Sequence, residues 1–274
     1  MSTQKSDSKK RSKPIARRAT LWILSCVGVL GIVGGITLTS ILSNQSSLRE
    51  GTNYLVNLDQ TDIQALSTKL EVRNREEKRA KLNAALDDTI NQETSIWPLF
   101  GNSIILGDSR PKGFSEFGFL PETIVWAQIG TSCLTIPDFT SRIQQALPEV
   151  IYISFGINDV LHGLGMQEEN GYGSMMEEFI QELLAVSPNS KIVVNSIIPT
   201  ATWLTNANPI WQNVPEYNRQ LQEMCARNGW VYVNNDEICD NGNASVYEGD
   251  GIHFYSYFYE LWAINMLRAQ IEAL

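Results

Sequence analysis

The chain begins with an uncharged apolar run and later changes to short apolar stretches that alternate with polar, helix-like ones. The apolar run covers residues 21–42 and reads LWILSCVGVLGIVGGITLTSIL. At about 1.5 Å of rise per residue, such a helix is roughly 33 Å long, enough to cross a bilayer core of about 30 Å. We therefore predict a transmembrane helix. A cleaved signal peptide is the alternative, but the run is long for one.

The segments on either side of this run indicate its orientation. Residues 1–20 hold seven Lys and Arg residues against Asp7 alone, and such basic segments stay in the cytoplasm. We therefore expect a basic cytoplasmic arm, a single pass through the cell membrane and an extracellular body. Residues 43–95 are polar at first and dense in charge at 71–81 (EVRNREEKRAK), which predicts a linker followed by a solvated helical stalk over 59–92.

Residues 96–274 alternate between strand-like and helix-like stretches. The expected strands cover residues 102–106, 123–128, 150–155, 191–198 and 230–234. The expected helices cover residues 136–147, 174–186, 215–228 and 255–273. This alternation predicts an α/β domain with a mostly parallel, five-stranded sheet covered by helices on both faces. In such sheets the ligand site lies beyond the carboxyl ends of the strands.

Charge and cysteine content narrow the class of protein. The net charge is −9, and residues 1–18 carry +6, so the rest of the chain carries −15, which argues against nucleic acid as a partner. Cys225 and Cys239 can form a disulfide, but with Cys133 the count in the body is odd, and we favour buried free thiols. The sequence has no CxxC motif or His-rich cluster, so we expect no metal, and the chemistry below needs no organic cofactor.

Four short motifs lie at or near the ends of the expected strands or loops. They are Gly107-Asp108-Ser109, Gly130, Gly156-Ile157-Asn158-Asp159 and Asp250-Gly251-Ile252-His253. Ser109 is a candidate nucleophile, and a serine hydroxyl needs an adjacent base near neutral pH. We assign His253 as that base, because Asp250 lies three residues earlier and can orient the imidazole. The only other histidine, His162, is expected in a loop at the rim of the cleft.

Taken singly, each motif has a plainer explanation as a turn, a strand end or a helix cap. In this order they resemble the SGNH hydrolases, also called GDSL-type esterases and lipases, over residues 102–274. The resemblance implies a flavodoxin-like three-layer α/β/α sandwich. It also implies that Ser109 is the nucleophile, that His253 is the general base and then acid, and that Asp250 orients it. The oxyanion hole would consist of the Ser109 and Gly130 backbone N–H groups and the Asn158 side chain.

Further residues near the expected site are candidates for binding substrate. Arg110 stands where the family usually has leucine, and we expect Arg110 and Asp108, which flank the nucleophile, to contact substrate. Three aromatic residues follow the fourth strand, where they can line a cleft and stack on sugars, with ordinary packing as the alternative. They are Trp203, Trp211 and Tyr217.

These features predict a membrane-anchored bacterial SGNH hydrolase that acts outside the cytoplasm as a serine esterase. We expect it to hydrolyse acyl esters through an acyl-enzyme, acetyl esters on cell-envelope carbohydrate in particular. The alternatives are acyl transfer to a glycan, a lipase or lysophospholipase, and a non-catalytic tethered binding domain. A non-catalytic domain would be expected to lack Ser109, Asp250 or His253, and none of them is missing. The sequence leaves the alcohol partner and the oligomeric state open.

Overall fold

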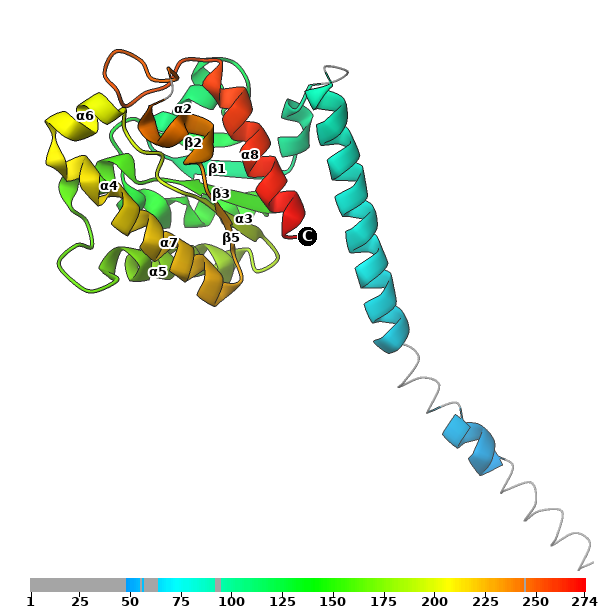
Figure 1. Ribbon diagram of the computed structural model, residues 1–274. Coiled ribbons are helices and arrows are strands. Elements are labelled where there is room, and N and C mark those ends of the chain that lie inside the picture. Colours follow the sequence, from blue (N-terminus) through cyan, green and yellow to red (C-terminus); the bar gives the residue numbers. More distant parts are fainter. Residues whose placement is uncertain (1–47, 55, 57–63, 92–94, 244) are drawn as a thin grey trace, which may run out of the picture. The chain divides into compact units, whose positions relative to one another are not determined.

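A computed structural model describes residues 48–54, 56, 64–91, 95–243 and 245–274 (Figure 1). The chain divides after Val72 into two compact units. The predicted cytoplasmic arm (1–20) and transmembrane helix (21–42) lie outside the described residues. None of the described helices is both long enough and apolar enough to cross a membrane.

Five parallel strands form one sheet in the order β2-β1-β3-β4-β5. They are β1 (Ser103–Gly107), β2 (Val125–Ala127), β3 (Val150–Ser154), β4 (Lys191–Asn195) and β5 (Val231–Val233). This is the strand order of flavodoxin-like doubly wound sheets. Every residue of β1, β2 and β3 is buried, because helices cover both faces of the sheet. The prediction of a five-stranded parallel sheet is confirmed.

Helices form the two outer layers. They are α2 (Ser109–Glu116), α3 (Thr140–Ala146), α4 (Ile157–His162), α5 (Gly171–Val186), α6 (Thr202–Ala207), α7 (Val214–Asn228) and α8 (Phe258–Glu272). Figure 1 shows α5 and α7 side by side on one face of the sheet and α8 on the other. The side chains of β1 alternate between the two cores, since successive residues of a strand point to opposite faces. Ile105 packs in the core beneath α8, whereas Ile104 and Leu106 pack in the core beneath α5 and α7.

Several short elements differ from the prediction. The helix expected over 136–147 is a 3₁₀-helix, η2 (Cys133–Phe139), followed by α3. The 3₁₀-helices η1 (Trp97–Phe100), η3 (Pro209–Asn213) and η4 (Glu237–Gly242) join other elements. The helices α2, α4 and α6 were not predicted, because each has eight residues or fewer and shows little apolar periodicity.

The charged helix that precedes the α/β body covers residues 64–90, and its part from Arg73 onward belongs to the same compact unit as the body. Leu86 is 2% exposed and packs into the core beneath α8. Lys78 Nζ lies 2.8 Å from Glu149 Oε2, at the start of β3. The charged residues 73–81 are exposed, as predicted, but the last turns of the helix pack on the body instead of standing free as a stalk.

The three cysteines of the body are free and buried. Cys225 and Cys239 do not form a disulfide, so the expected buried thiols are confirmed for these residues. Burial raises the pKa of the Cys225 thiol to about 12, and it raises the pKa of Cys133 and Cys239 as well.

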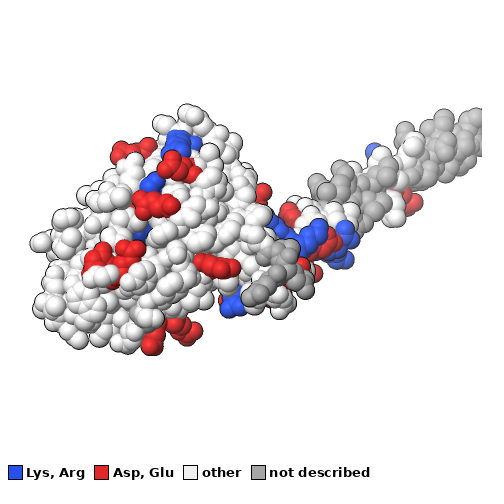
Figure 2. Space-filling view, turned by 90° about the horizontal axis from the view of Figure 1, so that it is seen from above, with Lys and Arg blue, Asp and Glu red and all other residues white. Residues whose placement is uncertain are grey.

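The charged side chains of the body are spread out. On the face seen in Figure 2, Asp and Glu side chains of the described residues lie in separate groups, and Lys and Arg side chains are fewer. This face lacks the continuous positive surface that phosphate backbones require.

Candidate active site

Ser109 is the first residue of α2 and lies just beyond the carboxyl end of β1. Asp108 caps this helix, since its Oδ1 accepts a hydrogen bond of 3.0 Å from the Arg110 N–H. Gly107 is required at the turn, because a Cβ there would lie 2.2 Å from Pro111 Cγ. The half-buried Ser109 hydroxyl is therefore presented at the N-terminus of a helix, where the backbone N–H groups favour negative charge.

The loop before α8 carries the other two members of the predicted triad. His253 Nδ1 lies 2.6 Å from Asp250 Oδ2, and His253 Nε2 lies 2.9 Å from Ser109 Oγ. Asp250 Oδ1 also accepts hydrogen bonds from the backbone N–H groups of Ile252 and His253, at 2.8 and 2.9 Å. Gly251 has a φ of +71°, a conformation that favours glycine and lets the loop fold back so tightly.

The electrostatics of this loop favour the ionised form of the Asp250 carboxylate. Partial burial by itself raises the pKa of Asp250, but hydrogen bonds from the His253 side chain and from the loop backbone outweigh it and lower the pKa below its usual value. An ionised Asp250 keeps the proton on Nδ1 of the imidazole, so Nε2 is free to accept the Ser109 proton. The structure thus brings all three residues together in the geometry of a nucleophile, a base and an orienting carboxylate.

The predicted oxyanion-hole residues follow strands that end at the same edge of the sheet. Gly107 pairs in register with the last residues of β2 and β3, and Gly130 and Asn158 follow those strands. Gly130 is exposed with a φ of +76°, and neither its N–H nor that of Ser109 donates a hydrogen bond to any described residue. Asn158 Nδ2 donates to the Thr131 carbonyl at 2.7 Å, which fixes the amide and leaves one N–H for a ligand.

Asp108 does not contact substrate as the sequence suggested. It is 1% exposed, and its Oδ2 accepts hydrogen bonds from the Gly156 and Ile157 N–H groups at 3.1 and 3.2 Å. Burial raises the pKa of Asp108 to about 6, although the Arg110 N–H and guanidinium oppose this shift. Its role is to join the serine turn to the helix that carries Asn158.

Arg110 is likewise buried instead of facing the cleft, and the prediction that it binds substrate is wrong. Its guanidinium donates to the Ile252 carbonyl at 3.0 Å and to the Ile198 carbonyl, and it lies 5.0 Å from the centre of the Phe254 ring. Burial lowers the pKa of Arg110, and the nearby Asp108 carboxylate counteracts this. Arg110 therefore ties the serine helix to the loop that holds His253.

Of the aromatic candidates, only Trp203 is exposed. Trp211 is 4% exposed and Tyr217 is fully buried, so both serve packing. Trp203 is 56% exposed, and a Cβ on Gly251 would lie 2.8 Å from its Cζ2 atom. Its indole therefore packs against the histidine loop at the rim of the site. His162 is exposed, and it is the last residue of α4 instead of the loop residue that was expected.

Sequence reasoning missed one further contributor to the site, Asp159. It is fully buried, and its Oδ1 accepts the Cys133 N–H at 3.0 Å, next to the Asn158 bond to Thr131. Consecutive side chains of α4 thus hold the loop that carries Gly130. Asp159 belongs to the Gly-Ile-Asn-Asp motif, but the neighbouring sequence does not distinguish this role from that of a helix cap.

Comparison with known proteins agrees with this geometry. The sequence pattern of the GDSL-like Lipase/Acylhydrolase family matches residues 99–261, well over half of the chain. No curated protein matches the sequence significantly. Among solved structures, a GDSL-like lipase from Bacteroides thetaiotaomicron is 17% identical with a TM-score of 0.48, covering 63% of this chain and 88% of its own.

Two further solved structures are similar. A lipase/acylhydrolase from Enterococcus faecalis is 16% identical with a TM-score of 0.47, covering 62% of this chain and 96% of its own. An acetyl xylan esterase from Geobacillus stearothermophilus is 14% identical with a TM-score of 0.42, covering 62% and 94%. The family match, which includes the serine turn, the Asn158 motif and the histidine loop, supplies the assignment: the chain belongs to the GDSL-like lipase/acylhydrolase family and is a carboxylic ester hydrolase.

Proposed function

We propose that the protein is a membrane-tethered serine esterase that hydrolyses acyl esters outside the cytoplasm, acetyl esters on cell-envelope carbohydrate in particular. The observation that carries the catalytic part is the chain of hydrogen bonds from Ser109 Oγ through His253 to Asp250. The location rests on the apolar segment 21–42 and the basic residues that precede it.

The geometry accounts for both halves of the reaction. Ser109 Oγ attacks the ester carbonyl carbon as its proton passes to His253 Nε2, and the carbonyl oxygen becomes an oxyanion facing the N–H groups of Ser109, Gly130 and Asn158. The bond to the alcohol then breaks, and the alcohol leaves with the proton from His253. In the second half a water molecule gives its proton to His253 and attacks the acyl-enzyme, releasing the acid and restoring the Ser109 hydroxyl.

The choice of a short acyl group, acetyl in particular, rests on the expected location at the cell envelope, and the range of ester chain lengths below tests it.

The catalytic part is tested with the full-length protein in detergent. Hydrolysis of p-nitrophenyl acetate, butyrate and octanoate is compared among the wild type, Ser109→Ala and His253→Ala. We expect kcat to fall by more than about 1,000-fold in each variant, because the two residues act as a unit. Ser115→Ala, in the same helix, is the matched control and should retain activity. Turnover that survives in Ser109→Ala would reject the assigned nucleophile, and a preference for octanoate would reject the short acyl group.

The location is tested separately in intact cells that express the full chain. Protease added outside should remove the body while a tag placed before residue 1 remains protected. A body that resists digestion until the cells are lysed would reject the proposed orientation without affecting the esterase assignment.

A further inference from the structure

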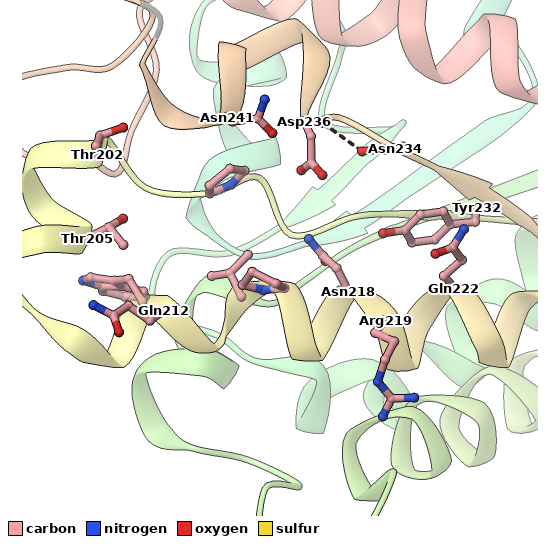
Figure 3. A pocket seen from close by; sticks show the side chains of 14 residues that line it. Thr202, Thr205, Gln212, Asn218, Arg219, Gln222, Tyr232, Asn234, Asp236 and Asn241 are labelled. Carbon is pink, nitrogen blue, oxygen red and sulfur yellow. Dashed lines mark hydrogen bonds between the residues drawn. The ribbon is translucent and has the colours of Figure 1, made fainter.

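A second concave site lies beside the catalytic loop, beyond the carboxyl ends of β4 and β5. It is a cavity of about 420 Å³, within the roughly 300–1,000 Å³ of ligand sites. Polar side chains from several elements converge on it (Figure 3). They include Thr202 and Thr205 of α6, Gln212 of η3, Gln222 of α7, and Asp236 and Asn241 of the segment that follows β5.

Several polar side chains that line the cavity form no hydrogen bond to other described residues of the chain. No described residue donates to the Asp236 carboxylate, which points into the cavity in Figure 3, and the Gln222 and Gln212 side chains likewise lack hydrogen bonds to described residues. Partial burial raises the pKa of Asp236, because a half-buried carboxylate without a hydrogen-bond donor costs free energy when it is ionised. A ligand that supplies donors to Asp236 would remove that cost.

The backbone beside Asp236 is held in an uncommon conformation. Asp240 and Asn241 both adopt a left-handed conformation, with φ of 47° and 51°. Such consecutive residues are rare outside glycine and occur preferentially at ligand sites. Here the conformation brings the exposed Asn241 side chain to the cavity opposite α7.

The charged groups of the cavity disfavour an anionic ligand and a metal ion. Its one cation, Arg219, points away from the cavity in Figure 3 and pairs with Glu216 and Glu223 at 2.7 and 2.6 Å. An anionic ligand would therefore find no available positive charge. No group of three His, Cys, Asp or Glu side chains suited to a metal ion occurs among the described residues, so a metal ion is disfavoured as well.

Apolar residues also line the cavity: the buried Trp211 and Val214, and the two prolines Pro199 and Pro215. A ligand that suits these walls has hydroxyl groups around its edge and C–H groups on its faces. Carboxylate and amide side chains match hydroxyl groups, since a carboxylate only accepts and an amide both donates and accepts. From these features we infer that the cavity is a binding site for an uncharged sugar unit.

One short helix, α6, lines this cavity and also packs against the catalytic loop. In α6, Thr202 and Thr205 line the cavity, whereas Trp203 packs against Gly251. The Ala201 N–H before α6 donates to the Gly251 carbonyl at 2.8 Å. If the proposed esterase function holds, the cavity binds a sugar unit of the same glycan whose ester is cleaved at Ser109, and this last step alone rests on that function.

The experiment measures binding without turnover. Full-length Ser109→Ala, in a detergent without a sugar headgroup, is titrated calorimetrically with cellotetraose, xylotetraose and chitotetraose. We expect at least one tetrasaccharide to bind with a dissociation constant in the millimolar range or below. Adding Asp236→Asn should weaken that binding at least tenfold, and adding Gln222→Ala should weaken it severalfold. Glu182→Gln, an exposed carboxylate of α5, is the matched control and should change nothing.

Failure of the inference is distinct from failure of the esterase assignment. Lack of binding by all three sugars at millimolar concentration would overturn the inference, as would binding that both cavity substitutions leave intact. Hydrolysis of p-nitrophenyl acetate by the wild type is measured in parallel. Sugar binding without hydrolysis would retain the cavity site and reject the esterase, whereas hydrolysis without sugar binding would do the reverse.

Discussion

Replacing Arg110 by leucine, the residue usual in the family at this position, should destabilise this protein strongly. The side chain is 4% exposed, and its loss leaves the Ile198 and Ile252 carbonyls without their donor. The Pro199 carbonyl stays satisfied, because Tyr247 Oη donates to it at 2.9 Å. One buried and one partly buried carbonyl left unsatisfied, at about 1–3 kcal/mol each, with the leucine side chain replacing the lost packing, predict a loss of about 4 kcal/mol.

Urea denaturation of the full chain, followed by tryptophan fluorescence, measures this loss. For a domain of this size, about 4 kcal/mol corresponds to a fall in Tm of roughly 8–16 °C. Arg268→Leu, on the exposed side of α8, is the matched control and should stay within about 0.5 kcal/mol of the wild type. A loss of less than about 1 kcal/mol in Arg110→Leu would mean that the guanidinium hydrogen bonds do not stabilise the fold.

Three further predictions concern the site and the helix that precedes the body. Asn158→Ala should lower kcat for p-nitrophenyl acetate by about 100- to 1,000-fold with little change in stability, and an unchanged kcat would remove Asn158 from the oxyanion hole. Because its hydrogen bonds lower the pKa of Asp250, the stability this carboxylate contributes is present above about pH 4 and is lost as the pH falls further. The difference in urea midpoint between the wild type and Asp250→Asn should therefore shrink from pH 7 toward pH 3, and a constant difference would contradict this. Leu86→Ala should cost about 2–4 kcal/mol, whereas Leu70→Ala, which is exposed, should cost little in the same urea titration.

The sheet was predictable because each strand is a local apolar run, but the strand ends were not. The strand expected over 191–198 stops at Asn195. Beyond it, the Ile197 N–H donates to Asn218 Oδ1 of α7 at 2.7 Å, so the backbone leaves the sheet to bond a side chain. A contact across 21 residues of sequence leaves no trace in a local pattern.

The proximity of the candidate catalytic residues was predictable for a related reason. Asp250 and His253 lie three residues apart, so their spacing alone suggests that they meet. Arg110 was misassigned because its partners are remote: the Ile198 and Ile252 carbonyls lie 88 and 142 residues away. A charged side chain next to a nucleophile indicates substrate contact only if it is exposed, and exposure depends on the tertiary fold.

The buried thiols of the body bear on how selectively the protein can be labelled. A thiol reacts as its thiolate, and burial raises the pKa of Cys133, Cys225 and Cys239, so all three remain protonated and shielded. The body also has no disulfide among its described residues, and its fold should be the same in reducing and oxidising media. An electrophilic probe added to either medium should therefore modify Ser109 in preference to any of these sulfur atoms.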